Sequence, residues 1–392
     1  MEGIVAEAVI DLDAIAHNVA LLAERALVDG DHPSSLMAVV KADAFGHGII
    51  PVSQAALKSG ASWLGVTSVE EALAVRGAGI DAPMLAWLYG TDDDFIAAID
   101  AGVDLSVSSI SHLESIVDAA EQAGRPALIH LKIDTGLTRN GVRFDDWPDL
   151  VRQARVREMD GTVRVHGIWS HLASADDPGN PSVPAQLAAF DRALEIARDS
   201  GLDPDLRHLA NSAGILDVPQ SHFDLVRAGI ALYGVEPIDG HDNGLRRAMT
   251  LRGRAVNVKR VGEGTGVSYM HEYITPGETT VVLVPLGYAD GVPRRVSNRG
   301  EVLIRGHRCR IAGRVAMDQF VVDAGDLPVE LGDPVVLFGP GDSGEPTVQD
   351  WATWAETNPH EILTGIGARV PRHYLPIKPE TLKNLEQEFA DG

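Results

Sequence analysis

Eight short apolar runs, separated by stretches with helical spacing, lie between about residue 36 and residue 230 and constrain the fold most. In the intervening segments 69–80 and 113–125, apolar residues recur at helical intervals and each segment ends near glycine. Eight strand–helix units over roughly 200 residues favour a (β/α)8 TIM-type barrel, with an open doubly wound sheet as the alternative. The predicted strands are Leu36–Val40, Trp63–Val66, Met84–Leu88, Val103–Val107, Ala127–Lys132, Val163–Trp169, Leu206–Leu209 and Leu225–Val226.

The pattern changes after about residue 245, where segments become short, rich in β-branched residues and interrupted by glycine and proline. This pattern is typical of a β-domain. One further apolar run, Ile4–Ile10, precedes the first barrel helix and is expected to pair with that C-terminal sheet. The predicted organisation is therefore an N-terminal strand in 1–10, a barrel in 11–245 and an all-β domain in 246–392.

Charge and cysteine content exclude several classes of protein. The 33 basic residues against 56 acidic ones give a net charge of -23, which argues against nucleic acid as a partner, because phosphates require a basic face. No apolar run approaches the roughly 18 residues that a membrane span needs, and the N-terminus does not resemble a signal peptide. A single cysteine, Cys309, fits a reducing compartment. We therefore expect a cytoplasmic protein without membrane contact.

Several polar residues follow directly on the predicted strands, where barrels place their chemistry. Lys41 closes the first strand, and partial desolvation there would favour the free amine that condenses with aldehydes. Position alone favours a simpler interpretation, in which Lys41 extends to water. Arg139 lies on a glycine-flanked loop after the fifth strand, where its guanidinium can bind a carboxylate or phenolate. His171 follows the sixth strand, and small residues after the seventh and eighth strands fit a phosphate site.

The ordered set of these motifs resembles the alanine racemase family. The matching segments are AVVKADAFGHG, LKIDTGLTRNG, WSHLASAD, HLANSAG, LVRAGIALYG, GVSYMHEY, LGYADGVPR and GRVAMDQ, and the resemblance as a whole covers about residue 36 to residue 372. The resemblance implies a barrel that binds pyridoxal 5'-phosphate (PLP), a following β-domain, and a homodimer whose active sites are shared between subunits. It implies interconversion of L- and D-alanine by two bases, which supplies D-alanine for peptidoglycan, and it implies no metal.

The resemblance also assigns roles to individual residues. Lys41 matches the lysine that binds PLP covalently and acts as one base, and Tyr269 matches the second base, contributed by the partner subunit. Arg227 matches the arginine that faces the pyridine nitrogen; because arginine retains its protons, it favours racemisation over transamination. The remaining matches are His171 in the hydrogen-bonded chain behind the tyrosine, Arg139 near the phenolate and substrate carboxylate, Lys132 as a carbamylation site, Met317 and Asp318 near the substrate carboxylate, and Asn211, Ser212, Gly229 and Ile230 at the cofactor, the last three at its phosphate.

Three positions depart from the family pattern. Phe45 and Ala368 replace tyrosines that contact the phosphate, and Thr138 replaces a glycine before the arginine. These departures leave open a racemase of serine or another small amino acid on the same scaffold. A barrel-plus-β decarboxylase would use a late catalytic cysteine, whereas Cys309 lies in the basic segment RGHRCRIAG. A barrel that only binds PLP would lack the second domain.

Overall fold

The computed structural model describes residues 5–28, 33–381 and 383, which form two compact units. The barrel unit contains the described residues of Ile15–Ala44, Ile49–Leu245 and Pro379–Gly392. The β unit contains those of Met1–Ala14, Phe45–Gly48 and Arg246–Lys378. The first four residues of the N-terminal segment, Ile4 of the expected strand included, lie outside the described residues.

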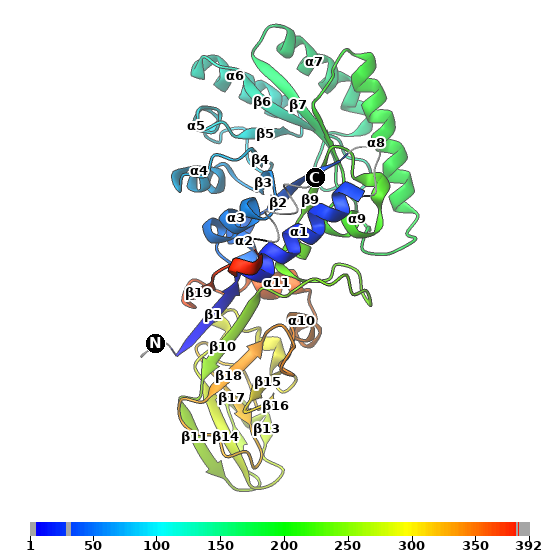
Figure 1. The fold of residues 1–392 in the computed structure, drawn as a ribbon. Coiled ribbons are helices and arrows are strands. Elements are labelled where there is room, and N and C mark those ends of the chain that lie inside the picture. Colours follow the sequence, from blue (N-terminus) through cyan, green and yellow to red (C-terminus); the bar gives the residue numbers. More distant parts are fainter. Residues whose placement is uncertain (1–4, 29–32, 382, 384–392) are drawn as a thin grey trace. The chain divides into compact units, whose positions relative to one another are not determined.

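Eight parallel strands form the sheet of the barrel unit, in the order β8-β7-β6-β5-β4-β3-β2-β9 (Figure 1). The two end strands are joined by backbone hydrogen bonds from Asp224 N to Arg207 O (3.0 Å) and from Arg227 N to Ala210 O (3.2 Å), so the sheet is nearly closed. The predicted barrel is confirmed, and the doubly wound sheet is wrong. The strands are β2 (Ser35–Val39), β3 (Trp63–Val66), β4 (Met84–Ala86), β5 (Asp104–Val107), β6 (Ala127–Lys132), β7 (Val163–Trp169), β8 (Leu206–His208) and β9 (Leu225–Ala228).

Helices connect successive barrel strands (Figure 1). Local chemistry sets their ends: Ser68 accepts a hydrogen bond from Glu71 N at the start of α4, and Gly124 ends α6 in a left-handed conformation. Helix α1 (Leu12–Val28) precedes the first barrel strand, and the connecting helices are α2 (Lys41–Gly46), α3 (Ile49–Lys58), α4 (Val69–Gly77), α5 (Phe95–Asp100), α6 (Ile110–Ala123), α7 (Trp147–Met159), α8 (Ser182–Asp199) and α9 (Ser212–Asp217).

Large side chains from different strands form a buried cluster within the barrel unit. Met37, Trp63, Leu85, Trp169 and Leu225 are buried together, with Trp87 and Leu206 packed against them. Glycine at position 65 is required by this packing, since a Cβ there would lie 2.7 Å from the Trp87 ring and 2.8 Å from the Met37 sulfur. The dense cluster gives the strand ends above it a rigid support.

The element labelled α2, which starts at Lys41, is a left-handed turn. Residues 42–45 have φ values between 52° and 54°, although none of them is glycine. Left-handed backbone costs about 1–2 kcal/mol per non-glycine residue. Hydrogen bonds from Ala42 N to Glu71 Oε1 (2.7 Å) and from Ile49 N to Asp43 Oδ1 (2.8 Å) offset part of this cost. The turn places Lys41 at the end of its strand on a strained but anchored backbone.

The β unit is built on a nine-stranded sheet in the order β11-β14-β17-β16-β15-β18-β10-β1-β19. Strand β1 (Ala6–Asp11) lies between β10, with which it is antiparallel, and β19, with which it is parallel. Two short helices, α10 (Val348–Ala355) and α11 (Pro359–Thr364), add to the strands that the sequence predicts here. The other strands are β10 (Met249–Arg254), β11 (Asn257–Val261), β14 (Thr279–Val284), β15 (Glu301–Ile304), β16 (His307–Ile311), β17 (Phe320–Asp323), β18 (Pro334–Phe338) and β19 (Arg372–Leu375).

None of the helices in the described part of the chain is both long enough and apolar enough to cross a membrane.

Candidate active site

The carboxyl ends of β2, β6 and β9 bring three cationic side chains to one region of the barrel unit. Lys132 Nζ lies 4.0 Å from the centre of the Trp169 ring, and the Arg227 guanidinium lies 4.9 Å from the same ring. Lys41 Nζ lies 6.0 Å from the Trp87 ring, which itself packs against Trp169. Trp169 is therefore the shared apolar wall of a strongly cationic site.

Burial and mutual repulsion change the protonation of both lysines. Burial lowers the pKa of Lys41, the charge of Arg139 lowers it further, and Glu71 partly opposes the shift. Burial, with the charges of Arg227 and Arg139, lowers the pKa of Lys132 to about 7. Both amines are therefore closer to their neutral, nucleophilic form than a lysine in water.

Arg227 is held in one orientation by its hydrogen bonds. Its Nη2 lies within hydrogen-bond distance of the carbonyl oxygens of Ser170 (2.7 Å) and Leu209 (3.0 Å) and of Nδ1 of His171 (3.2 Å), so its two N–H groups are shared among three acceptors. Its Nη1 donates to Nδ1 of His208 (3.1 Å). Among the described residues none accepts a hydrogen bond from Nε, so that N–H can serve a ligand. Burial lowers the pKa of Arg227 to about 9, which still leaves it cationic at neutral pH.

Both histidines that accept from Arg227 are neutral. Burial, followed by the charge of Arg227, lowers the pKa of His171 and of His208 well below the usual value. Because arginine only donates, Nδ1 of each ring must be the unprotonated nitrogen. Each ring therefore carries its proton on Nε2. His171 can therefore donate a hydrogen bond from Nε2 to an acceptor. The predicted role of His171, which is to support the Tyr269 hydroxyl through a hydrogen bond, requires such a donor.

The small residues after β8 and β9 form a compact turn around one hydroxyl. Ser212 Oγ accepts hydrogen bonds from Gly229 N (2.9 Å) and Ala231 N (3.3 Å), so its own proton is free to be donated. Ile230 begins a 3-10 helix immediately after Gly229. Asn211 is the N-cap of α9, where its side-chain oxygen accepts from Gly214 N (3.0 Å). The Ser212 hydroxyl is therefore a donor that this turn offers to an anion.

Arg139 lies on an exposed loop that Asp134 organises. The Asp134 carboxylate accepts hydrogen bonds from Gly136 N (2.9 Å) and Thr138 N (3.0 Å). Thr138 has a φ of 56°, a conformation in which a β-branched residue is strained. Glycine is expected at this position because it adopts a positive φ without strain. Threonine adopts the same turn, but with a strained backbone.

Tyr269 lies on an exposed turn of the β unit, between β12 (Gly266–Val267) and β13 (Tyr273–Ile274). Its side chain is 68% exposed, that of Met270 is 79% exposed and that of Met317 is 53% exposed. The turn contacts the segment before Met317, because Ser268 Oγ donates to Arg314 O (2.7 Å).

Asp318 is held in place by an ion pair. Arg369 bridges Asp318 (2.8 Å) and the buried Asp290 (2.8 Å). Tyr288, 45% exposed, lies beside this segment, since its N–H donates to Ala316 O (3.0 Å). We call these four exposed residues of the β unit, Tyr269, Met270, Tyr288 and Met317, the tyrosine face.

Two of the three departures from the family pattern, Phe45 and Ala368, lack the hydroxyl group of the expected tyrosine. Phe45 is buried in the β unit, and its ring packs at 5.8 Å from the ring of His360. Ala368 is exposed on a turn after α11. Cys309 is buried, and burial raises the pKa of its thiol to about 11, which makes it a poor nucleophile. The decarboxylase alternative, which needs a reactive late cysteine, loses its candidate.

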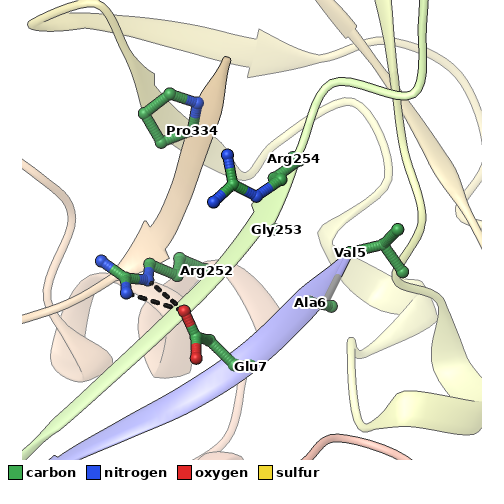
Figure 2. A pocket seen from close by; sticks show the side chains of 7 residues that line it. All are labelled: Val5, Ala6, Glu7, Arg252, Gly253, Arg254 and Pro334. Atoms are coloured by element: carbon green, nitrogen blue, oxygen red, sulfur yellow. Dashed lines mark hydrogen bonds and ion pairs between the residues drawn. The ribbon is translucent and has the colours of Figure 1, made fainter. Parts of the chain in front are cut away.

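One concave site in the β unit lies away from these residues (Figure 2). It is lined by Val5, Ala6, Glu7, Arg252, Gly253, Arg254 and Pro334. Arg252 donates to Glu7 Oε1 through both Nε (2.9 Å) and Nη2 (2.7 Å). The ion pair uses one carboxylate oxygen of Glu7, and Arg254 donates to Gly332 O (3.1 Å) instead.

The residues of the barrel site suit an anionic, planar ligand. Cationic groups converge on an aromatic wall, and a free hydroxyl and a free guanidinium N–H face no acceptor within the described residues. A phosphorylated pyridine aldehyde fits this donor set.

Sequence reasoning did not identify Trp169 and His208 as parts of the site. The available signal for His208 was its position at the end of β8, the barrel strand next to β9, which carries Arg227.

Comparisons with known proteins agree along nearly the whole chain. The family description "Alanine racemase, N-terminal domain" matches residues 10–237, and "Alanine racemase, C-terminal domain" matches residues 248–374. The chain is 54% identical to the alanine racemase of Thermobifida fusca over 370 residues, which are 94% of this chain and 98% of that protein. The alanine racemase of Frankia casuarinae is 52% identical over 374 residues, which are 94% of this chain and 96% of that protein.

Solved structures give the same result. The alanine racemase from D-cycloserine producing Streptomyces lavendulae superposes with a TM-score of 0.94 at 48% identity, covering 97% of this chain and 100% of that one. The alanine racemase of Streptomyces coelicolor A3(2) superposes with a TM-score of 0.91 at 50% identity, covering 94% and 98%.

Proposed function

The chain belongs to the alanine racemase family and is an isomerase that interconverts L- and D-alanine; on this premise, we propose that it binds PLP through Lys41 and uses Lys41 and Tyr269 as its two bases. The observation that carries the proposal is the convergence of the partly buried Lys41 with Lys132 and Arg227 at the carboxyl ends of the barrel strands. When bound, PLP withdraws electrons from the substrate α-carbon and makes its proton acidic.

Each part of the cofactor has a matching group. Ser212, with the backbone at Gly229 and Ile230, would hold the phosphate, and Asn211 supports this turn by capping α9. Arg227 Nε would face the pyridine nitrogen, and the Trp169 region would cover the ring. Arg139 would contact the phenolate and the substrate carboxylate, with Met317 and Asp318 from the partner subunit near that carboxylate.

The two bases act on opposite faces of the α-carbon. Lys41, whose pKa is lowered, takes the proton on one face as a neutral amine and, in the reverse direction, delivers it as the ammonium ion. Tyr269 of the partner subunit does so on the other face. His171 assists, because its Nε2–H can donate to the phenolate oxygen while its Nδ1 accepts from Arg227. Arg227 retains its protons, so it does not protonate the pyridine nitrogen, and this favours racemisation over transamination.

Borohydride reduction tests the choice between the two lysines. The lower pKa of Lys132 would by itself make Lys132 the better amine for binding the PLP aldehyde. However, Lys132 is buried against Trp169, whereas Lys41 is partly exposed and can be reached by the cofactor. We expect peptide mass spectrometry of the reduced holoenzyme to find the pyridoxyl group on Lys41. Lys41→Ala should remove the label and Lys132→Arg should retain it. A label on Lys132, or no label, would refute the cofactor assignment.

Mixed dimers test whether the sites are shared. Lys41→Ala and Tyr269→Phe should each reduce the rate by about 10²–10⁴-fold, since each removes one general acid–base group. A mixed dimer of the two variants restores one complete site if Tyr269 enters from the partner. Random mixing should then recover about one quarter of the wild-type rate. Mixtures that stay as inactive as either variant alone would contradict the shared site.

A further inference from the structure

A chain of buried hydrogen bonds extends from Arg227 through the barrel interior. His208 Nδ1 accepts from Arg227, and His208 Nε2 lies 2.9 Å from His130 Nδ1. His130 Nε2 lies 3.0 Å from Asp104 Oδ2. The three residues come from β8, β6 and the start of β5, and each is at most 2% exposed. None of the assigned catalytic or binding roles uses His130 or Asp104.

The direction of every hydrogen bond in this chain follows from its two ends. Arg227 can only donate, so His208 Nδ1 is unprotonated and the His208 proton lies on Nε2. That proton is donated to His130 Nδ1, so the His130 proton lies on Nε2 and is donated to Asp104. An ionised carboxylate only accepts, so the order is the same when it is derived from the Asp104 end.

The charges along the chain agree with this order. Burial lowers the pKa of His208 and of His130, so both rings are neutral near pH 7. Burial acts to raise the pKa of Asp104, but hydrogen bonds from His130 and His166 outweigh it and the pKa is lowered. A buried carboxylate thus remains ionised at the end opposite Arg227.

Packing holds the central ring in place. A Cβ on residue 167 would lie 2.3 Å from His130 Nδ1, the acceptor atom, so glycine at 167 is what allows the ring to occupy its position. The ring of His208 stacks on Trp169 with centroids 5.4 Å apart and an interplanar angle of 9°. Neither histidine can turn its ring without displacing a buried neighbour.

We propose that Asp104 is a positioning residue for the racemase reaction, which acts through His130 and His208 to fix the orientation of Arg227 toward the cofactor's ring nitrogen. The proposal rests on the proposed cofactor site. If Asp104 loses its charge, His130 and His208 are free to adopt the other tautomer. His208 Nδ1–H would then face the Arg227 N–H, and the guanidinium would move.

His166 supplies a matched control. Its Nδ1 lies 2.5 Å from the same Asp104 oxygen, but its Nε2 faces Asp205 at 3.7 Å, away from Arg227. His166→Gln therefore removes the other histidine partner of Asp104 while the chain to Arg227 is kept. Asp104→Asn changes that chain, because its amide can present an N–H to His130.

The first experiment uses the wild-type enzyme without cofactor. Long-range proton–nitrogen NMR of protein with ¹⁵N-labelled histidine distinguishes the tautomers, and His208 and His130 should both carry their proton on Nε2. An Nδ1–H tautomer at either ring would overturn the proposal. This readout does not depend on Lys41 binding PLP, so the failure of the proposed cofactor site is recognised separately, by borohydride labelling.

The second experiment compares variants of the holoenzyme. Asp104→Asn should lower kcat about 10–100-fold, as loss of an outer hydrogen-bond partner does at other sites, and should raise the pyruvate released per racemisation turnover. His166→Gln should stay within about twofold of wild type in both. If Asp104→Asn does not fold, Gly167→Ala takes its place, because the added Cβ displaces His130 Nδ1. Gly167→Ala should show the same lower kcat and higher pyruvate ratio. Unchanged kcat and pyruvate ratio in a folded variant would overturn the proposal.

Elemental analysis tests whether the same residues bind a metal ion instead. Ligand atoms of Asp104, His130 and His166 lie within 4.8 Å of one another, close enough for a metal ion. Each of these side chains has a hydrogen-bond partner in the cluster. Enzyme purified without chelator should contain no stoichiometric transition metal, and a bound ion would overturn the proposal because it would replace the bond from His130 to Asp104.

Discussion

At the residue scale, the site depends on side chains whose protonation differs from that in water. Lys132 has the larger change, since burial and then the charges of Arg227, Arg139 and Lys41 lower its pKa to about 7. An uncharged amine in a cationic site can react with carbon dioxide to give a carbamate and a proton. The carbamate would replace a repelling cation with an anion beside Arg227 and Arg139.

We predict a carbamate on Lys132 that increases as the pH rises through about 7, because only the free amine adds carbon dioxide. Carbon-13 NMR of enzyme equilibrated with ¹³C-bicarbonate measures it directly. Lys41→Arg should keep the signal and Lys132→Arg should lose it. A signal that survives in Lys132→Arg, or none in the wild type, would refute this assignment.

At the scale of elements, one helix start supports the backbone that follows Lys41. Glu71, in the first turn of α4, accepts from Ala42 N through Oε1 (2.7 Å) and from Thr67 N through Oε2 (2.8 Å). The same carboxylate raises the pKa of Lys41 against burial and Arg139. Glu71 therefore anchors the left-handed turn and tunes the amine at its start.

Glu71→Gln is expected to lower the pKa of Lys41 further, because the charge that favours the ammonium form is removed. The midpoint of the pH dependence of PLP uptake by the cofactor-free enzyme should shift to lower pH. Stability should fall by about 1 kcal/mol, since one of the two backbone N–H groups that donate to Glu71 loses its acceptor. The control, Glu70→Gln, changes the neighbouring residue and should leave the midpoint in place; an equal shift in both variants would contradict this role.

At the scale of the whole molecule, the tyrosine face is the feature that a single chain leaves unexplained. Tyr269, the proposed second base, is 68% exposed, and no hydrogen bond from its hydroxyl is seen among the described residues. A second copy of the chain supplies one if its barrel site covers this face. The active unit is then the homodimer.

Met270→Glu is predicted to weaken dimerisation, because it introduces a charge into the proposed interface. Sedimentation equilibrium should show more monomer, and the specific activity should fall on dilution while borohydride still labels Lys41. Met159→Glu makes the same change at a residue that is 73% exposed at the end of α7 and should have no effect. Full activity from a monomeric Met270→Glu enzyme would rule out the shared site.

Much of the fold was predictable from sequence because barrel strands are short apolar runs in regular alternation with helices. Three strands, among them Ala127–Lys132, have the predicted bounds, and the rest differ at their ends, as Ser35–Val39 and Leu225–Ala228 do. Helix α10 was missed, although its Thr347 and Asp350 form a capping box that the sequence displays. The strained backbone of residues 42–45 could not be read from residue types, since none of them is glycine.

The sequence by itself determined that Lys41, Arg139, His171 and Arg227 close strands or follow them, and the ordered motifs determined the family. Only the tertiary structure decided which groups meet. His130 and His208 are 78 residues apart in the chain, and both are buried in apolar strands where a histidine predicts nothing specific. Their tautomers follow from contacts at both ends of a hydrogen-bonded chain. Such contacts form only when separate strands close into one barrel, because the direction of each bond depends on its neighbours in space.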